Sequence, residues 1–136
     1  MIGMLVLSHG RLAQEFVLTL EHILGPQAAI KAIGIEPNDD IEEKRYQLIR
    51  EIKEVDQGKG VVVFTDMFGG TPSNLALSLM QDKNIEIVAG VNLPMLVKFA
   101  SVRATKSFQE AITMAEESGK NYINVGSRIL KPKKSA

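Results

Sequence analysis

The sequence contains no cysteine among its 136 residues, which excludes disulfides, thiol catalysis, Cys-based zinc sites and iron–sulfur clusters. An excess of one charge is also missing, because 16 Lys and Arg residues balance 16 Asp and Glu residues. Such a balance favours neither nucleic acid nor an anionic membrane as a partner. No apolar run approaches the roughly 20 residues that a membrane-spanning helix needs, and no basic leader precedes the first apolar run. We therefore expect a cytoplasmic protein with no membrane-inserted segment.

Histidine is scarce, and this narrows the possible chemistry. The chain has two histidines, His9 and His22, so any histidine chemistry must use one of them. His22 lies off the apolar stripe of a predicted helix, which is typical of a solvated surface residue. His9 lies two residues after the end of an apolar run, residues 2–7, that predicts a buried strand. We therefore take His9 as the candidate for chemistry.

Short apolar runs alternate along the chain with longer amphipathic ones, and this predicts alternating strands and helices. We predict one domain over residues 1–130 and a polar, basic tail over 131–136. The predicted strands cover 2–7, 29–35, 61–64, 85–89 and 122–125. The predicted helices cover 11–24, 40–55, 72–80, a segment that follows 90–94, and 107–118. Alternation of this kind is typical of an α/β fold with a mostly parallel sheet.

Local signals set the expected helix ends. Asp39 and Glu42 have the spacing of a capping box before the second helix. Thr71 is a suitable N-cap with Pro72 as the first helical residue. Gly119 is expected to end the last helix.

The expected strand order is 2-1-3-4, in a doubly wound sheet flanked by helices. The runs at 2–7 and 61–64 are fully apolar, so both should be central strands that are buried on two faces. The order then reverses between the first and third strands, and ligands bind at such a point, beside the carboxyl ends of the strands. His9 and Asp66 follow these two strands and should meet there.

A His–Asp pair in that place can support nucleophilic chemistry. The Asp66 carboxylate can accept a hydrogen bond from one ring nitrogen of His9, which fixes the tautomer and leaves the lone pair of the other nitrogen free. The carboxylate also stabilises the positive charge that develops on the ring during attack. We predict that His9 is a phosphoryl acceptor and that Asp66 orients it.

Glycines and helix starts near this pair indicate an anion site. Main-chain N–H groups at helix starts bind phosphate-sized anions, and the candidates for phosphoryl binding are Gly10, Arg11, Gly69, Gly70 and Thr71. Nucleotide-binding glycine motifs are missing, so a protein donor fits better than ATP, and neither a metal nor a cofactor is predicted. A purely structural alternative stays open at this point, in which Asp66 caps a turn and the glycines only connect a strand to a helix.

Three segments carry a resemblance to a known family: SHGRLA at 8–13, TDMFGGTPSN at 65–74 and AGVNLPML at 89–96. Together they resemble the IIA component of the mannose-family phosphoenolpyruvate-dependent sugar phosphotransferase system. The resemblance implies that His9 accepts a phosphoryl group from the histidine phosphocarrier protein HPr and passes it to a IIB component. It also implies that Asp66 orients His9 and that Thr71 lines the phosphoryl pocket.

The resemblance further implies a homodimer that exchanges a short, possibly antiparallel last strand, for which residues 122–125 are the candidate. The chain departs from the best-known members at Arg11 and Phe68, and we expect no IIB domain fused to it. The expected lack of a fused IIB domain leaves a second interpretation open. In it the protein is a regulatory binding module, controlled by phosphorylation, that works without a cognate sugar permease.

Overall fold

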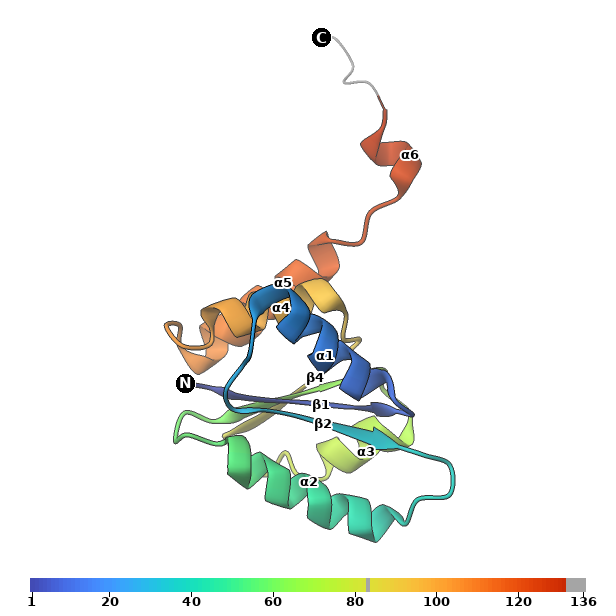
Figure 1. The fold of residues 1–136 in the computed structure, drawn as a ribbon, viewed down its shortest axis with the longest axis vertical. Helices are drawn as coiled ribbons and strands as arrows, with labels where there is room; N and C mark the ends of the chain where they lie inside the picture. Colours follow the sequence, from blue (N-terminus) through green and yellow to red (C-terminus); the bar gives the residue numbers. More distant parts are fainter. Residues whose placement is uncertain (83, 132–136) are drawn as a thin grey trace.

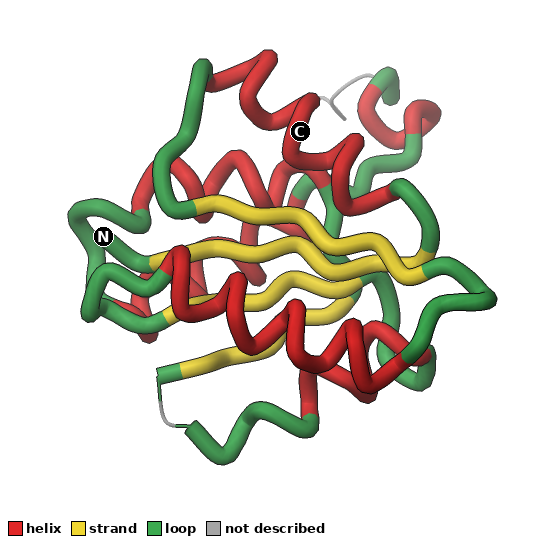
Figure 2. Tube along the Cα trace, turned by 60° about the horizontal axis from the view of Figure 1, so that its bottom comes forward, coloured by secondary structure: helices red, strands yellow, loops and turns green. Residues whose placement is uncertain are grey.

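The computed structural model describes residues 1–82 and 84–131, which build a four-stranded sheet with helices on both faces. The strand order is β2-β1-β3-β4, and all three strand pairs are parallel. Figure 2 shows the strands side by side between the helices. The strands are β1 (Gly3–His9), β2 (Ile30–Ile35), β3 (Val61–Thr65) and β4 (Ile85–Ala89). The predicted α/β fold and strand order are confirmed.

Helices cover the two faces of the sheet unequally (Figure 1). One face carries α1 (Leu12–Leu24), α4 (Leu93–Val102) and α5 (Phe108–Asn121). The other face carries α2 (Ile41–Val55) and α3 (Thr71–Leu77). A last short helix, α6 (Gly126–Ile129), stands away from the body of the molecule.

The side chains of β1 supply both halves of the core. Met4 and Val6 pack among the residues of α1, α4 and α5, whereas Leu5 and Leu7 pack among those of α2 and α3. This division follows from the alternation of side chains along a strand. All four side chains have zero exposure. Burial on both faces confirms the central position that the apolar run predicted, and this position brings the end of β1 next to the end of β3.

Two of the expected helix starts are wrong by one residue. The N-cap of α2 is Asp40, whose Oδ1 accepts the Glu42 N–H at 2.9 Å and the Glu43 N–H at 3.3 Å. The carboxylate of Asp39 instead accepts the Glu36 N–H at 2.8 Å within the preceding loop. The N-cap of α3 is Gly70, so Thr71 is the first helical residue.

The predicted end of the last helix at Gly119 is also wrong, because α5 continues to Asn121. Gly119 is buried, and a Cβ on it would lie 2.8 Å from the Cε of Met95 in α4. The glycine therefore allows α4 and α5 to pack closely and does not terminate the helix. This packing outweighs the roughly 1 kcal/mol that glycine costs inside a helix.

The predicted fifth strand is wrong for this chain on its own. Tyr122 is the C-cap of α5 in a helical conformation, and residues 123–125 pair with no strand among the residues that the structure describes. A strand requires a partner for its main-chain groups, and this segment leads away from the sheet (Figure 1). Most of the predicted tail, residues 132–136, lies outside the described residues.

Within 1–82 and 84–131, no helix combines the length and the apolar character that a bilayer crossing demands.

Candidate active site

His9 and Asp66 meet at the carboxyl edge of the sheet, as the strand order predicted. His9 is the last residue of β1, and Asp66 directly follows β3. The ring Nδ1 of His9 lies 2.7 Å from Asp66 Oδ2, and the same oxygen accepts the main-chain N–H of His9 at 2.8 Å. The His9 side chain is 53% exposed, whereas that of Asp66 is only 13% exposed. The carboxylate thus holds both the ring and the backbone of an accessible histidine.

Asp66 is itself fixed from two further directions. Its Oδ1 accepts the Met67 N–H at 2.9 Å, and its carbonyl oxygen accepts the Gly90 N–H at 3.1 Å. Burial on its own raises the pKa of Asp66, but the hydrogen bonds from His9 and Met67 and the charge attraction of His9 outweigh burial and lower the pKa below its usual value. Asp66 is therefore an anion at neutral pH.

The ionised carboxylate determines the tautomer of the neutral imidazole. A carboxylate has only acceptor sites, so the ring nitrogen that faces it must carry the proton. Nδ1 of His9 is the nitrogen that faces Asp66. The lone pair of a neutral ring is then on Nε2, the nitrogen that does not face Asp66. This is the arrangement that a nucleophilic histidine needs.

The turn after β1 is held by two residues that the sequence analysis missed. The buried Ser8 hydroxyl donates to the His9 carbonyl at 3.0 Å and accepts the Ala13 N–H of α1 at 2.7 Å. A Cβ on Gly34 of β2 would lie 1.9 Å from the Gly10 carbonyl oxygen, so only glycine allows this turn to pack against β2. Ser8 precedes His9 in the sequence, which is a weak signal, and no spacing in the sequence points to Gly34.

Three of the predicted phosphoryl-binding residues lie around His9. Gly10 turns the chain with φ +55°, and its N–H donates to the Ile35 carbonyl at 2.8 Å. Thr71 lines a cleft of about 480 Å³ together with His9 and Gly10; the other lining residues are Ile35, Glu36, Pro37 and Ile41. Gly70 lies so close to the His9 ring that a Cβ on it would be 2.6 Å from Cε1.

The other two predicted residues are placed differently. Gly69 lies in the exposed loop before α3 with φ +90°, a conformation that favours glycine. The Arg11 side chain is 77% exposed, and its guanidinium lies 3.8 Å from a Glu15 carboxylate oxygen on the same helix. The structure therefore does not bring the Arg11 charge to His9. His22 is exposed, in the last turn of α1, as predicted.

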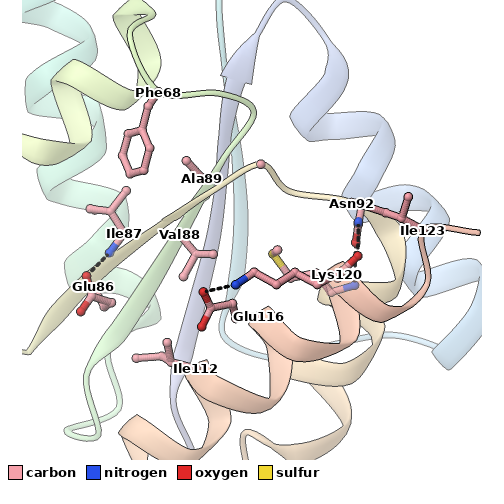
Figure 3. A pocket seen from close by; sticks show the side chains of 13 residues that line it. Phe68, Glu86, Ile87, Val88, Ala89, Asn92, Ile112, Glu116, Lys120 and Ile123 are labelled. Atoms are coloured by element: carbon pink, nitrogen blue, oxygen red, sulfur yellow. Dashed lines mark hydrogen bonds and ion pairs between the residues drawn. The ribbon is translucent and has the colours of Figure 1, made fainter.

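A second hollow, of about 340 Å³, runs beside the edge strand β4 (Figure 3). Phe68, in the loop after Asp66, lies at one end of it, and the ion pair of Lys120 and Glu116, 3.1 Å apart, lies in its wall. The Asn92 amide donates to the Gly119 carbonyl at 2.9 Å and so connects the start of α4 to α5. The lining of the hollow beside β4 includes neither His9 nor Asp66. This hollow is therefore distinct from the cleft beside His9.

A family model described as "PTS system fructose IIA component" matches residues 3–116. The chain belongs to this family of phosphotransferase-system IIA components. The resemblance that the sequence motifs carry is confirmed. It is 33% identical over 134 residues to the "PTS system mannose-specific EIIAB component" of Escherichia coli, an alignment that covers 97% of this chain and 40% of that protein. The chain thus spans 40% of the length of the first curated relatives that it matches.

Other IIA relatives have similar lengths and folds. The "PTS system fructose-specific EIIA component" of Bacillus subtilis is 26% identical over 141 residues, with 100% of this chain and 94% of that protein covered. The EIIA crystal structure from Streptococcus agalactiae superposes with a TM-score of 0.85 at 26% identity and covers 94% of this chain and 99% of that one. The mannose/sorbose-specific IIA subunit from Enterococcus faecalis superposes with a TM-score of 0.82 at 25% identity and covers 98% of both chains.

Proposed function

We propose that His9 takes a phosphoryl group from the phosphohistidine of HPr and passes it to a histidine of a IIB component during sugar uptake. The observation that carries this proposal is the 2.7 Å contact between His9 Nδ1 and Asp66 Oδ2. The contact orients the ring, keeps the ring proton on Nδ1 and leaves the lone pair of Nε2 as the nucleophile. Membership of the IIA family supplies the class of donor and acceptor.

The proposed transfer balances without a further reactant. The lone pair of His9 Nε2 attacks the phosphorus atom while the P–N bond of the donor breaks, and the donor imidazole keeps the bonding electron pair. The His9 ring becomes positively charged, keeps its Nδ1 proton and gains attraction to the ionised Asp66. Because one phosphohistidine replaces another, we expect a reversible step close to thermoneutral, with no metal or cofactor.

The loop before α3 is the proposed cradle for the phosphoryl oxygens. The main-chain N–H groups of Gly69, Gly70 and Thr71 and the Thr71 hydroxyl are the donors that we assign to it. Fixed donors of this kind stabilise the charge that the transition state develops. Arg11 would have to leave Glu15 and change rotamer before its charge could contribute.

The test is a reconstituted relay with phosphoenolpyruvate, the general phosphotransferase enzyme, HPr and this protein. We expect one acid-labile, base-stable phosphoryl group, mapped to Nε2 of His9, which moves to added IIB and returns to HPr when the relay is reversed. A phosphate that survives acid, or one on His22, would overturn the proposal. Label that stays on His9 and never reaches IIB would favour the regulatory module instead.

We also propose that two copies associate through the segment that follows α5. Residues 121–130 are all exposed, among them Ile123 at 75% and Leu130 at 83%. Exposed apolar side chains in a row are a common mark of an interface. Pairing of residues 122–125 with a second copy would give this segment the strand partner that it lacks in one chain.

For this association we expect light scattering to give twice the mass of one chain for the wild type. An Ile123→Asp/Val125→Asp variant should give the mass of a single chain, because charge disfavours burial in the interface. The control is Thr113→Asp, which introduces one negative charge, against two in the double variant, at an exposed position of α5. A variant that keeps the wild-type mass would exclude this segment as the interface.

A further inference from the structure

Gly70 has a backbone conformation that any residue can adopt. Its φ of −93° and ψ of 169° are extended, so chain geometry does not require glycine at this position. The surroundings of its missing side chain are more restrictive. A Cβ would lie 2.6 Å from Cε1 and 3.0 Å from Nε2 of His9, and the next atom, Cδ of Pro72, would be 3.7 Å away. The atoms that leave no room for a side chain are therefore those of the His9 ring.

We propose that Gly70 is a positioning residue for His9, a role that rests on and deepens the proposed phosphoryl transfer. Because it has no side chain, the first turn of α3 can pack against the edge of the imidazole that carries Nε2. Asp66 holds the ring through Nδ1 at 2.7 Å. The ring thus lies between the Asp66 carboxylate at Nδ1 and Gly70 at its Cε1 and Nε2 atoms.

A methyl group at residue 70 would disturb both edges of the ring. Carbon atoms that are not bonded are stable about 3.5 to 4.0 Å apart, so the ring would have to move or turn, and the directional hydrogen bond to Asp66 would weaken. The methyl group would also stand beside Nε2, where the phosphorus atom of the donor must approach in line with the lone pair. Both effects act on the transfer step more than on the docking of HPr.

We expect Gly70→Ala to lower the maximal rate of His9 phosphorylation by at least about tenfold, since a misplacement near 1 Å can cost about a hundredfold in rate. The HPr concentration for half-maximal rate should change little. The second readout is the imidazole ¹⁵N shifts, measured where both rings are neutral, with His22 as the internal reference. The wild type should show His9 mainly as the Nδ1–H tautomer, and Gly70→Ala should show a smaller Nδ1–H fraction.

Two further variants separate this role from a structural one. Gly70 is also the N-cap of α3, and alanine is a poorer N-cap than glycine, whereas serine is a better one. Gly70→Ser therefore improves the cap and keeps the Cβ, so we expect it to be as slow as Gly70→Ala. Thr113→Ala is the control, because Thr113 is an exposed residue of α5 outside every proposed site; it should match the wild type in rate and tautomer.

Three results would overturn the inference. The first is a Gly70→Ala protein that matches the wild type in both rate and tautomer. The second is recovery of the rate in Gly70→Ser, which would assign the effect to helix capping. The third is a slow Gly70→Ala protein with an unchanged tautomer and a raised half-maximal HPr concentration, which would assign it to docking. If wild-type His9 takes up no phosphoryl group, the proposed function fails, while the tautomer comparison still tests the contact between Gly70 and the ring.

Discussion

The His9→Ala variant is expected to take up no phosphoryl group from HPr, whereas His22→Ala is expected to be labelled at the wild-type rate. The protein has two histidines, and only the His9 ring is paired with a carboxylate at the carboxyl edge of the sheet. Removal of the imidazole removes the nucleophile itself, so the loss should be complete and no higher HPr concentration should restore it. The measurement is incorporation of phosphate from phosphoenolpyruvate through HPr, quantified by intact-protein mass.

The fold of His9→Ala should survive, which makes the result interpretable. The His9 side chain is half exposed, and the main-chain N–H of residue 9 can still donate to Asp66 Oδ2. Circular dichroism and the unfolding midpoint should therefore stay close to those of the wild type. Phosphate uptake that persists in His9→Ala and disappears in His22→Ala would place the chemistry on α1 and contradict the assignment.

The sheet order and the His9–Asp66 pair were predictable because they follow from burial. A strand with unbroken apolar sequence must be covered on both faces, which places β1 and β3 in the centre and brings their ends together. The residues that follow these strands are then neighbours whatever the details of the loops. Register confirms this, since Leu7 of β1 pairs with Thr65 of β3, one residue before Asp66.

Contacts between side chains of distant segments were not predictable from such patterns. The apolar period predicts a buried stripe of α1 with Ala13 beside it; the stripe is Leu12, Phe16, Leu20 and Ile23. Leu20 and Ala13 are fully buried, but Leu12 and Ile23 are 46% and 51% exposed. The buried face is therefore centred nearer to Ala13, which packs in the core beside Leu20, than the apolar period alone indicates.

Glycines were the most ambiguous signals in the sequence. A glycine pattern indicates a turn, a helix end or close packing, and only coordinates separate these roles. Gly119 was expected to end a helix and instead packs against Met95. Gly70 was expected to contribute an N–H group, and its contact with the His9 ring depends on the exact position of α3. The predicted strand at 122–125 is wrong for a different reason. Its apolar residues indicate burial, but they do not indicate whether the partner strand belongs to the same chain.

Asp66→Asn is expected to retain the fold and to slow the phosphorylation of His9 by about 10- to 100-fold. The wild-type hydrogen bond joins Nδ1 to an ionised carboxylate at 2.7 Å, and bonds to charged groups contribute about 1.5–3 kcal/mol. An amide oxygen can still accept the His9 N–H, but it cannot offset the positive charge that forms on the ring during transfer. Asn also presents donors, which permit the wrong ring tautomer. The measurement is the single-turnover rate with phospho-HPr.

Asp56→Asn is the matched control for this prediction. Like Asp66, Asp56 accepts a main-chain N–H through Oδ1, in its case that of Gly58 at 2.8 Å. Asp56 precedes β3, whereas Asp66 follows it, so Asp56 lies at the opposite edge of the sheet. The control should transfer at the wild-type rate. The phospho-His9 form of Asp66→Asn should also lose its phosphoryl group to HPr more readily at equilibrium, because the charged ring has lost its partner. Equal rates and equal equilibria in Asp66→Asn and the wild type would remove Asp66 from the mechanism and leave it a residue that only fixes the ends of β1 and β3.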